Sequence, residues 1–216
     1  MSLLFAVTLF VSAFLLFWMQ PLAGKILLPL LGGTPAVWNT CMLFFQGMLL
    51  AGYAYVLAVT RRLKTRGQVL LHGALLLAAA LFTALGGATA AAGDAPAEGN
   101  PAGWLLKVLL LTVGPPFFVV SATAPLLQKW FSRTRDASAG DPYFLYAASN
   151  AGSLCALLAF PLLLEPNWTL EGQRASWAFG YGLLAVLILA CGAAAWRSRT
   201  LVVDASLEAL HGGVGD

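Results

Sequence analysis

The 216-residue chain contains few charged residues and few cysteines. Charged residues make up 10% of the sequence, against about 25% in an average soluble protein. This low charge argues against a disordered chain, and three cysteines are too few for a disulfide framework. The net charge of +3 is too small to indicate nucleic-acid binding. Because hydrophobic residues make up 60% of the chain, the composition predicts a polytopic membrane protein.

Long apolar segments cover well over half of the sequence. A transmembrane helix needs about 20 mostly apolar residues to cross a hydrocarbon layer of about 30 Å. Apolar runs such as Leu70–Leu85 lack the alternation of a β-barrel strand, so helices are predicted. We expect an all-α bundle of six transmembrane helices at 1–199 and a short cytoplasmic tail at 200–216, with a surface helix from Leu201 to Leu210. The predicted spans are 3–24, 36–59, 68–87, 104–124, 143–164 and 176–196.

The basic residues are concentrated in alternate connections between these segments. Connections after the second, fourth and sixth segments hold nine of them, whereas those after the third and fifth segments hold only Arg174. Cytoplasmic loops are enriched in Lys and Arg. Both termini are therefore predicted to be cytoplasmic, with the chain in a bacterial inner membrane. The nine residues are Arg61, Arg62, Lys64, Arg66, Lys129, Arg133, Arg135, Arg197 and Arg199.

None of the acidic residues lies inside a predicted span, and Glu165 directly follows the fifth. Proton-coupled carriers and intramembrane acid–base enzymes usually place Asp, Glu or His within the membrane. We expect a structural role for His72, and positions near the outer surface for Lys25 and Lys107. The HExxH, GxSxG, P-loop and GxGxxG motifs are also absent. We therefore predict no catalytic residue and no metal site, and the sequence identifies no cofactor. The cysteines Cys41, Cys155 and Cys191 are predicted to be buried core residues.

Uncharged polar side chains lie within several of the apolar segments. In the fifth segment Tyr143, Tyr146 and Asn150 have i, i+3, i+7 spacing and so share one helix face. One interpretation is a polar pocket shared by the second, fourth and fifth segments. The plainer interpretation is hydrogen bonding between helices, worth about 0.6–2 kcal/mol per bond in a membrane. The candidate pocket residues are Gln20, Asn39, Gln46, Tyr143, Tyr146 and Asn150.

Two further patterns concern the shape and packing of the helices. Pro115 and Pro116 in the fourth segment are predicted to kink the helix and to form a candidate hinge. Ala148 and Gly152 in the fifth segment form a small-residue pair that predicts close contact with another helix.

Several sequence blocks occur in a recognisable order. The first set is SAFLLFWMQPLAGK at 12–25, GGTPAVWNT at 32–40, and FFQG at 44–47 with AGYAY at 51–55. The second set is PPFF at 115–118, SATAPLLQ at 121–128 and LYAASNAGS at 145–153, followed by Glu165-Pro. Together they resemble the transmembrane part of bacterial spermidine-synthase-like integral membrane proteins, a half major-facilitator-like bundle fused to a synthase-like domain. That domain carries Gly-rich and acidic motifs which this sequence lacks, so the resemblance implies the membrane module without synthase activity.

Two functions are compatible with these observations. The first is a non-catalytic membrane subunit that scaffolds or anchors partners, which would be other membrane subunits or a separate synthase-like soluble protein. The alternative is a transporter of a small polyamine-like or amino-acid-like solute, which would work as a homodimer of six-helix halves. An intramembrane enzyme ranks third, because no nucleophile–base or metal set is visible. The lipid bilayer is a predicted partner in every case, and nucleic acid is not.

Overall fold

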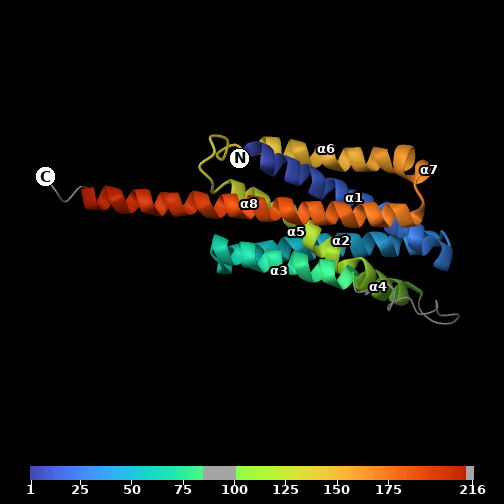
Figure 1. Cartoon of the computed structure of the whole chain (residues 1–216). Coiled ribbons are helices and arrows are strands. Elements are labelled where there is room, and N and C mark those ends of the chain that lie inside the picture. The colour runs from blue at the N-terminus through green and yellow to red at the C-terminus, as the bar shows by residue number, and fades with distance from the viewer. Residues whose placement is uncertain (85–100, 213–216) are drawn as a thin grey trace.

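The computed structural model describes residues 1–84 and 101–212, and in this part the side chains at 28–31, 101 and 199–212 are not described. The described chain is almost entirely helical and contains no strand, as predicted. Most of the helices run alongside one another in an elongated bundle (Figure 1). They are α1 (Ser2–Leu31), α2 (Pro35–Arg62), α3 (Thr65–Ala84), α4 (Pro101–Thr112), α5 (Gly114–Phe131), α6 (Tyr143–Ala159), the π-helical segment η1 (Phe160–Leu164), α7 (Glu165–Asn167) and α8 (Leu170–Gly212).

Five helices of the described chain are long and apolar enough to cross a membrane. The fourth predicted segment, 104–124, is two helices, because α4 and α5 are separated at Val113 and bent by 68°. Counted together as one broken span, they would make a sixth. The bend has a local cause: Pro115 and Pro116 lack the N–H that a continuous helix needs, and their rings crowd the preceding turn.

The reversal between α1 and α2 is encoded in a few residues. Gly32 adopts a φ of 76°, which glycine tolerates without steric cost. Thr34 then caps α2, because its side-chain oxygen accepts a hydrogen bond from the Val37 backbone N–H at 3.4 Å. Pro35 follows at the first helical position, where its missing N–H costs nothing.

The last helix is longer than the sequence predicted. α8 runs for 43 residues without a break, so residues 201–210 continue it and do not form a separate surface helix. No Gly or Pro occurs between Ala193 and Leu210, and nothing there would end a helix. At 1.5 Å per residue α8 is about 65 Å long, and its C-terminal part extends past the other helices (Figure 1).

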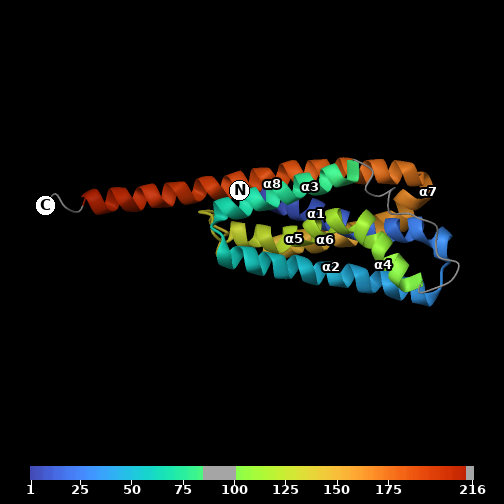
Figure 2. The same ribbon diagram turned by 90° about the horizontal axis from the view of Figure 1, so that it is seen from below.

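The packing is centred on α1, which contacts α5, α6 and α8. Gly152 allows α6 to approach α1, since a Cβ at this position would collide with the backbone carbonyl of Phe10. The close contact predicted at Gly152 is thus confirmed. α2 packs on α5, and α3 packs on α8 and α5. In Figure 2, α3 and α8 lie along one edge of the bundle and α2 lies along the opposite edge. The largest fully buried side chains include Phe5, Phe117, Trp130 and Phe131.

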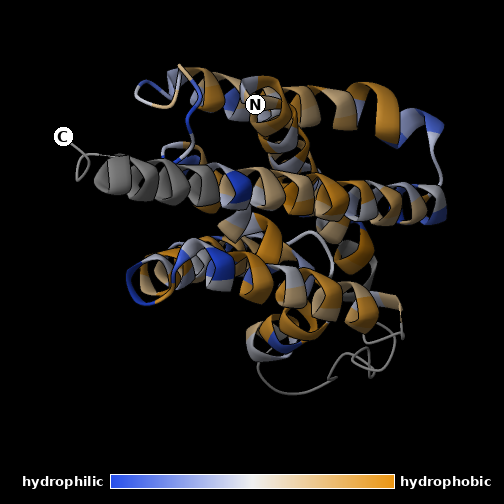
Figure 3. Cartoon of the chain, turned by 60° about the vertical axis from the view of Figure 1, so that its left-hand side comes forward, coloured by the Kyte–Doolittle hydropathy of each residue, from blue (hydrophilic) through white to orange (hydrophobic). Residues whose placement is uncertain are grey.

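The two ends of the bundle differ in charge. The N-terminus, the α2–α3 and α5–α6 connections and the free end of α8 lie at the same end (Figure 1). The basic residues of both connections are therefore gathered there, while Asp94 and Glu98 lie outside the described residues. Hydrophilic residues concentrate at the connections, and the helices between them are largely hydrophobic (Figure 3). Asp136 joins the N-terminus to the α5–α6 connection: its carboxylate lies 3.3 Å from the Met1 amino group and accepts a hydrogen bond from the Ser2 hydroxyl at 2.8 Å.

Candidate functional site

The six residues of the predicted polar pocket lie on three helices, α1, α2 and α6. Gln20 is half-buried on α1, and the other five side chains are exposed on α2 and α6. α2 packs mainly on α5, and α6 packs mainly on α1. No side chain of the six makes a hydrogen bond to any residue that the structure describes. Other polar side chains do bond between these helices, since the Ser121 hydroxyl on α5 donates to the Met48 carbonyl on α2 at 3.4 Å. A pocket shared by the six residues stays a prediction.

The three polar residues of α6 lie together on its outer face. Tyr143 and Tyr146 are 77% and 51% exposed, and their ring centroids are 6.5 Å apart. Asn150 is also exposed. It lies about 10 Å from Tyr143 along the helix axis, at a rise of 1.5 Å per residue. We call these three residues the α6 polar face. The predicted spacing is thus correct, but the face points away from the bundle.

A second exposed amide lies on α2. Gln46 is about 16 Å along the helix axis from the first residue of α2. Its neighbours on the exposed face, Leu43 and Leu50, are 66% and 70% exposed. Asn39 is exposed on the same helix, closer to its start. The amide of Gln46 is therefore surrounded by apolar surface.

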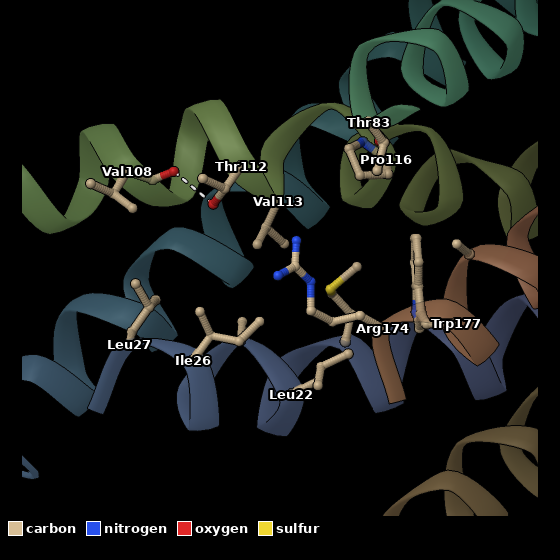
Figure 4. Close-up of a pocket in the computed structure, with 13 residues that line it drawn as sticks. Leu22, Ile26, Leu27, Thr83, Val108, Thr112, Val113, Pro116, Arg174 and Trp177 are labelled. Atoms are coloured by element: carbon tan, nitrogen blue, oxygen red, sulfur yellow. Dashed lines mark hydrogen bonds between the residues drawn. The ribbon is translucent and has the colours of Figure 1, made fainter. Parts of the chain in front are cut away.

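A cavity of about 360 Å³ lies beside the α4–α5 bend, at the end of the bundle away from the N-terminus. Its walls come from α1, α3, α4, α5 and α8 and are mostly apolar. Leu22, Ile26 and Leu27 form the α1 side, and Val108 and Val113 face them (Figure 4). Its volume lies within the ~300–1,000 Å³ that is usual for small-molecule sites.

Arg174 is the charged residue of this cavity. It lies in the first turns of α8, and its guanidinium reaches toward Val113 (Figure 4). It has neither an ion pair nor a hydrogen bond with any described residue. Glu165 is engaged elsewhere, because it lies 2.7 Å from the ammonium of Lys25. An unpaired guanidinium thus borders an apolar space.

The bend supplies the wall of the cavity between α4 and α5. The hydrogen-bond ladder continues on both sides, from Val113 N–H to Leu109 O at 2.9 Å and from Phe117 N–H to Val113 O at 3.0 Å. Between these bonds Pro115 and Pro116 have no N–H to offer to the preceding turn. Pro116 lines the cavity. The predicted kink is present, and movement about it stays a prediction.

His72 lies in a cluster with Tyr55, Gln68 and Trp130, in the half of the bundle nearer the N-terminus. Its side chain is fully buried, and neither ring nitrogen has a hydrogen-bond partner. Its ring centroid lies 6.0 Å from that of Tyr55 and 6.5 Å from that of Trp130. The Trp130 indole N–H donates to Gln68 at 2.9 Å, and Gln68 donates to the Leu63 carbonyl at 2.7 Å. A buried imidazole held between aromatic rings, with no hydrogen bond to either nitrogen, favours the structural role expected from the sequence.

The cysteines follow the predicted pattern only in part. Cys41 and Cys191 are buried, as predicted, but Cys155 is exposed because it lies on the outward side of α6. Within residues 1–84 and 101–212, no group of three or more His, Cys, Asp or Glu is placed to hold a metal ion.

Comparison with protein-family models, with curated proteins and with solved structures found no match. The resemblance to spermidine-synthase-like membrane proteins therefore stays a hypothesis, and the functional assignment depends on the geometry of the chain itself.

Sequence reasoning did not find the cavity or the position of Arg174 beside it. Arg174 was notable only as a basic residue in an otherwise acidic connection. The cavity forms where five elements meet at the α4–α5 bend, so no local pattern marks it. The Gln68–Trp130 hydrogen bond was also missed, because its partners are 62 residues apart.

Proposed function

We propose that the chain is a non-catalytic integral membrane subunit that binds partner proteins through the α6 polar face. The observation that supports this function is the exposure of Tyr143, Tyr146 and Asn150 on a helix long and apolar enough to cross a membrane. Tyr143 suits a membrane interface, where tyrosine is common. Asn150 lies about 10 Å deeper, where lipid offers no hydrogen-bond partner.

A partner helix would remove this unfavourable contact with lipid. Side-chain hydrogen bonds between membrane helices contribute about 0.6–2 kcal/mol each, so an asparagine and a tyrosine side by side can stabilise an interface. Gln46 on α2 gives a second exposed amide at mid-helix. The long α8 extends past the bundle at the basic end, and it provides surface for a further contact outside the membrane.

The interior of one chain argues against a pore. Phe5, Phe117, Trp130 and Phe131 are at most 1% exposed and fill the space between α1, α5 and their neighbours. A role at the surface of the bundle therefore agrees with the structure better than passage through it.

The orientation follows the basic residues. We propose that the end bearing the N-terminus and the α2–α3 and α5–α6 connections is cytoplasmic, in a bacterial inner membrane, since cytoplasmic loops are rich in Lys and Arg. The partners would be other membrane subunits or, as the family resemblance implies, a separate synthase-like soluble protein.

Site-specific photocrosslinking tests the proposal. A benzophenone amino acid replaces Tyr146 on the α6 polar face, and in a matched control it replaces Phe179, which is 78% exposed on α8. We expect an adduct of defined mass with another polypeptide at position 146 and none at position 179. Equal yields at both positions, or no protein adduct at position 146, would contradict the proposed interface.

The alternative is a carrier for a small solute that works as a homodimer. The broken α4–α5 span beside a cavity is the observation that favours it, since discontinuous helices commonly form transport sites. However, the unpaired charge at the cavity is that of Arg174, which would repel a polyamine. A crosslink from position 146 to a second copy of the chain, followed by solute uptake into reconstituted vesicles, would favour this alternative.

A further inference from the structure

The polar groups around the α4–α5 cavity are occupied, with one exception. The Thr83 hydroxyl donates to the Ala79 carbonyl at 2.8 Å, and the Thr112 hydroxyl donates to the Val108 carbonyl at 2.8 Å. The Trp177 indole N–H donates to the Leu15 carbonyl at 3.0 Å. These donors therefore bond within the protein, and among the described lining residues Arg174 is left as the group that can recognise a ligand.

The rest of the cavity is hydrocarbon. α1 contributes Leu22, Ile26 and Leu27, and the bend contributes Val108 and Val113. A neutral polar solute would lose its hydrogen bonds to water here without replacing them, which is unfavourable. A hydrocarbon chain would find an apolar environment here and would lose no hydrogen bonds.

We propose that this cavity binds an anionic amphiphile, with its hydrocarbon chain against α1 and the α4–α5 bend and its head group on Arg174. A planar guanidinium binds carboxylate and phosphate oxygens through two parallel hydrogen bonds. Arg174 lies near the start of α8, at the end of the bundle, so the head group would lie at the surface and the chain would extend inward. The ligand class is thus a fatty-acid carboxylate or the phosphate of an anionic lipid.

This site is separate from the α6 polar face. Its residues lie on α1, α3, α4, α5 and α8, and none lies on α6. Its failure in a binding test would leave the proposed subunit function unaffected, and the reverse also holds.

Native mass spectrometry of the full chain in neutral detergent tests the proposal with three probes: phosphatidylglycerol, oleate and phosphatidylcholine. We expect at least one of the anionic probes to bind more tightly than phosphatidylcholine. Oleate alone would identify a free fatty acid as the ligand, and phosphatidylglycerol alone would identify a membrane lipid.

Two variants separate the cavity from general surface charge. Arg174→Gln is expected to weaken binding of the anionic probe about tenfold or more, since hydrogen bonds to charged groups are worth about 1.5–3 kcal/mol. Lys107→Gln, which removes an exposed positive charge on α4 outside the cavity lining, is expected to leave binding unchanged. Arg174 is exposed and makes no bond within the described chain, so its replacement should not disturb folding.

Ala178→Phe provides the test of the hydrocarbon part. This exposed residue lines the cavity, and a phenyl ring there is expected to abolish binding of the anionic probe by occupying the space. Equal binding of anionic and zwitterionic lipids, or equal effects of Arg174→Gln and Lys107→Gln, would overturn the proposal. Unchanged binding to a folded Ala178→Phe variant would overturn it as well.

Discussion

Replacing Gly152 with alanine is expected to separate α6 from α1. A Cβ at position 152 would meet the backbone carbonyl of Phe10 at less than a van der Waals distance. A flexible side chain could rotate away from such a contact, but a helical carbonyl cannot. The added methyl group must therefore displace one helix from the other.

A matched substitution isolates the cost of this contact. Gly182 is also inside a helix, α8, but a Cβ there would have no neighbour within 4 Å. Both Gly→Ala changes gain about 0.5–1 kcal/mol from the better helix propensity of alanine. Gly152→Ala also incurs an overpacking cost of about 1–3 kcal/mol. The propensity gain cancels in the comparison, so Gly152→Ala should be less stable than Gly182→Ala by about 1–3 kcal/mol.

Unfolding by sodium dodecyl sulfate in mixed micelles, followed by circular dichroism, measures the free energy of unfolding of each variant. We expect Gly182→Ala to be at least as stable as the unmodified chain and Gly152→Ala to be less stable. Equal free energies of unfolding for the two variants would refute the α1–α6 contact as described.

Three further predictions concern other parts of the chain. His72→Phe should leave the free energy of unfolding unchanged or raise it by about 1–2 kcal/mol, because the imidazole is buried without a hydrogen-bond partner; a loss of stability in the same micelle assay would reveal a polar partner. Hydrogen bonds from the Ser138 backbone N–H and from Ser2 lower the pKa of Asp136 from its ordinary value of 3.8 to about 2. Asp136 therefore stabilises the fold fully above its ordinary pKa and loses this effect as the pH falls toward about 2. Unfolding curves between pH 2 and 6 measure the dependence of stability on pH. The Asp136→Asn variant should lose this dependence, and the Asp141→Asn variant should keep it. The orientation can be tested with an impermeant thiol reagent in a Cys155→Ala background. The reagent should label a Thr169→Cys variant in intact cells and an Ala137→Cys variant only after permeabilisation. The opposite result would reverse the proposed orientation.

The helices themselves could be predicted because their causes are local. Long apolar segments and basic connections can be identified from neighbouring residues of the sequence alone. Pro115 and Pro116 indicated the bend for the same reason, since the missing N–H groups are a property of the residues and not of their surroundings. The continuous α8 was not predicted, because the change from apolar to polar composition near Arg197 is typical of the end of a membrane span.

The candidate site could not be predicted, because it depends on how the helices are rotated. The spacing of Tyr143, Tyr146 and Asn150 established a shared face, but not the direction in which it points. That direction follows from the opposite side of α6, where Leu145, Gly152 and Ala156 are buried. The α4–α5 cavity likewise depends on the meeting of five elements.

The most direct test of the proposed function is the mass of the chain after gentle extraction from its own membrane. Native mass spectrometry should find it with other polypeptides at a fixed stoichiometry. Asn150→Leu should dissociate that assembly, whereas the control Phe179→Leu should preserve it. A chain that is always alone, or that forms only a homodimer, would contradict the proposed function, and the homodimer would favour the carrier.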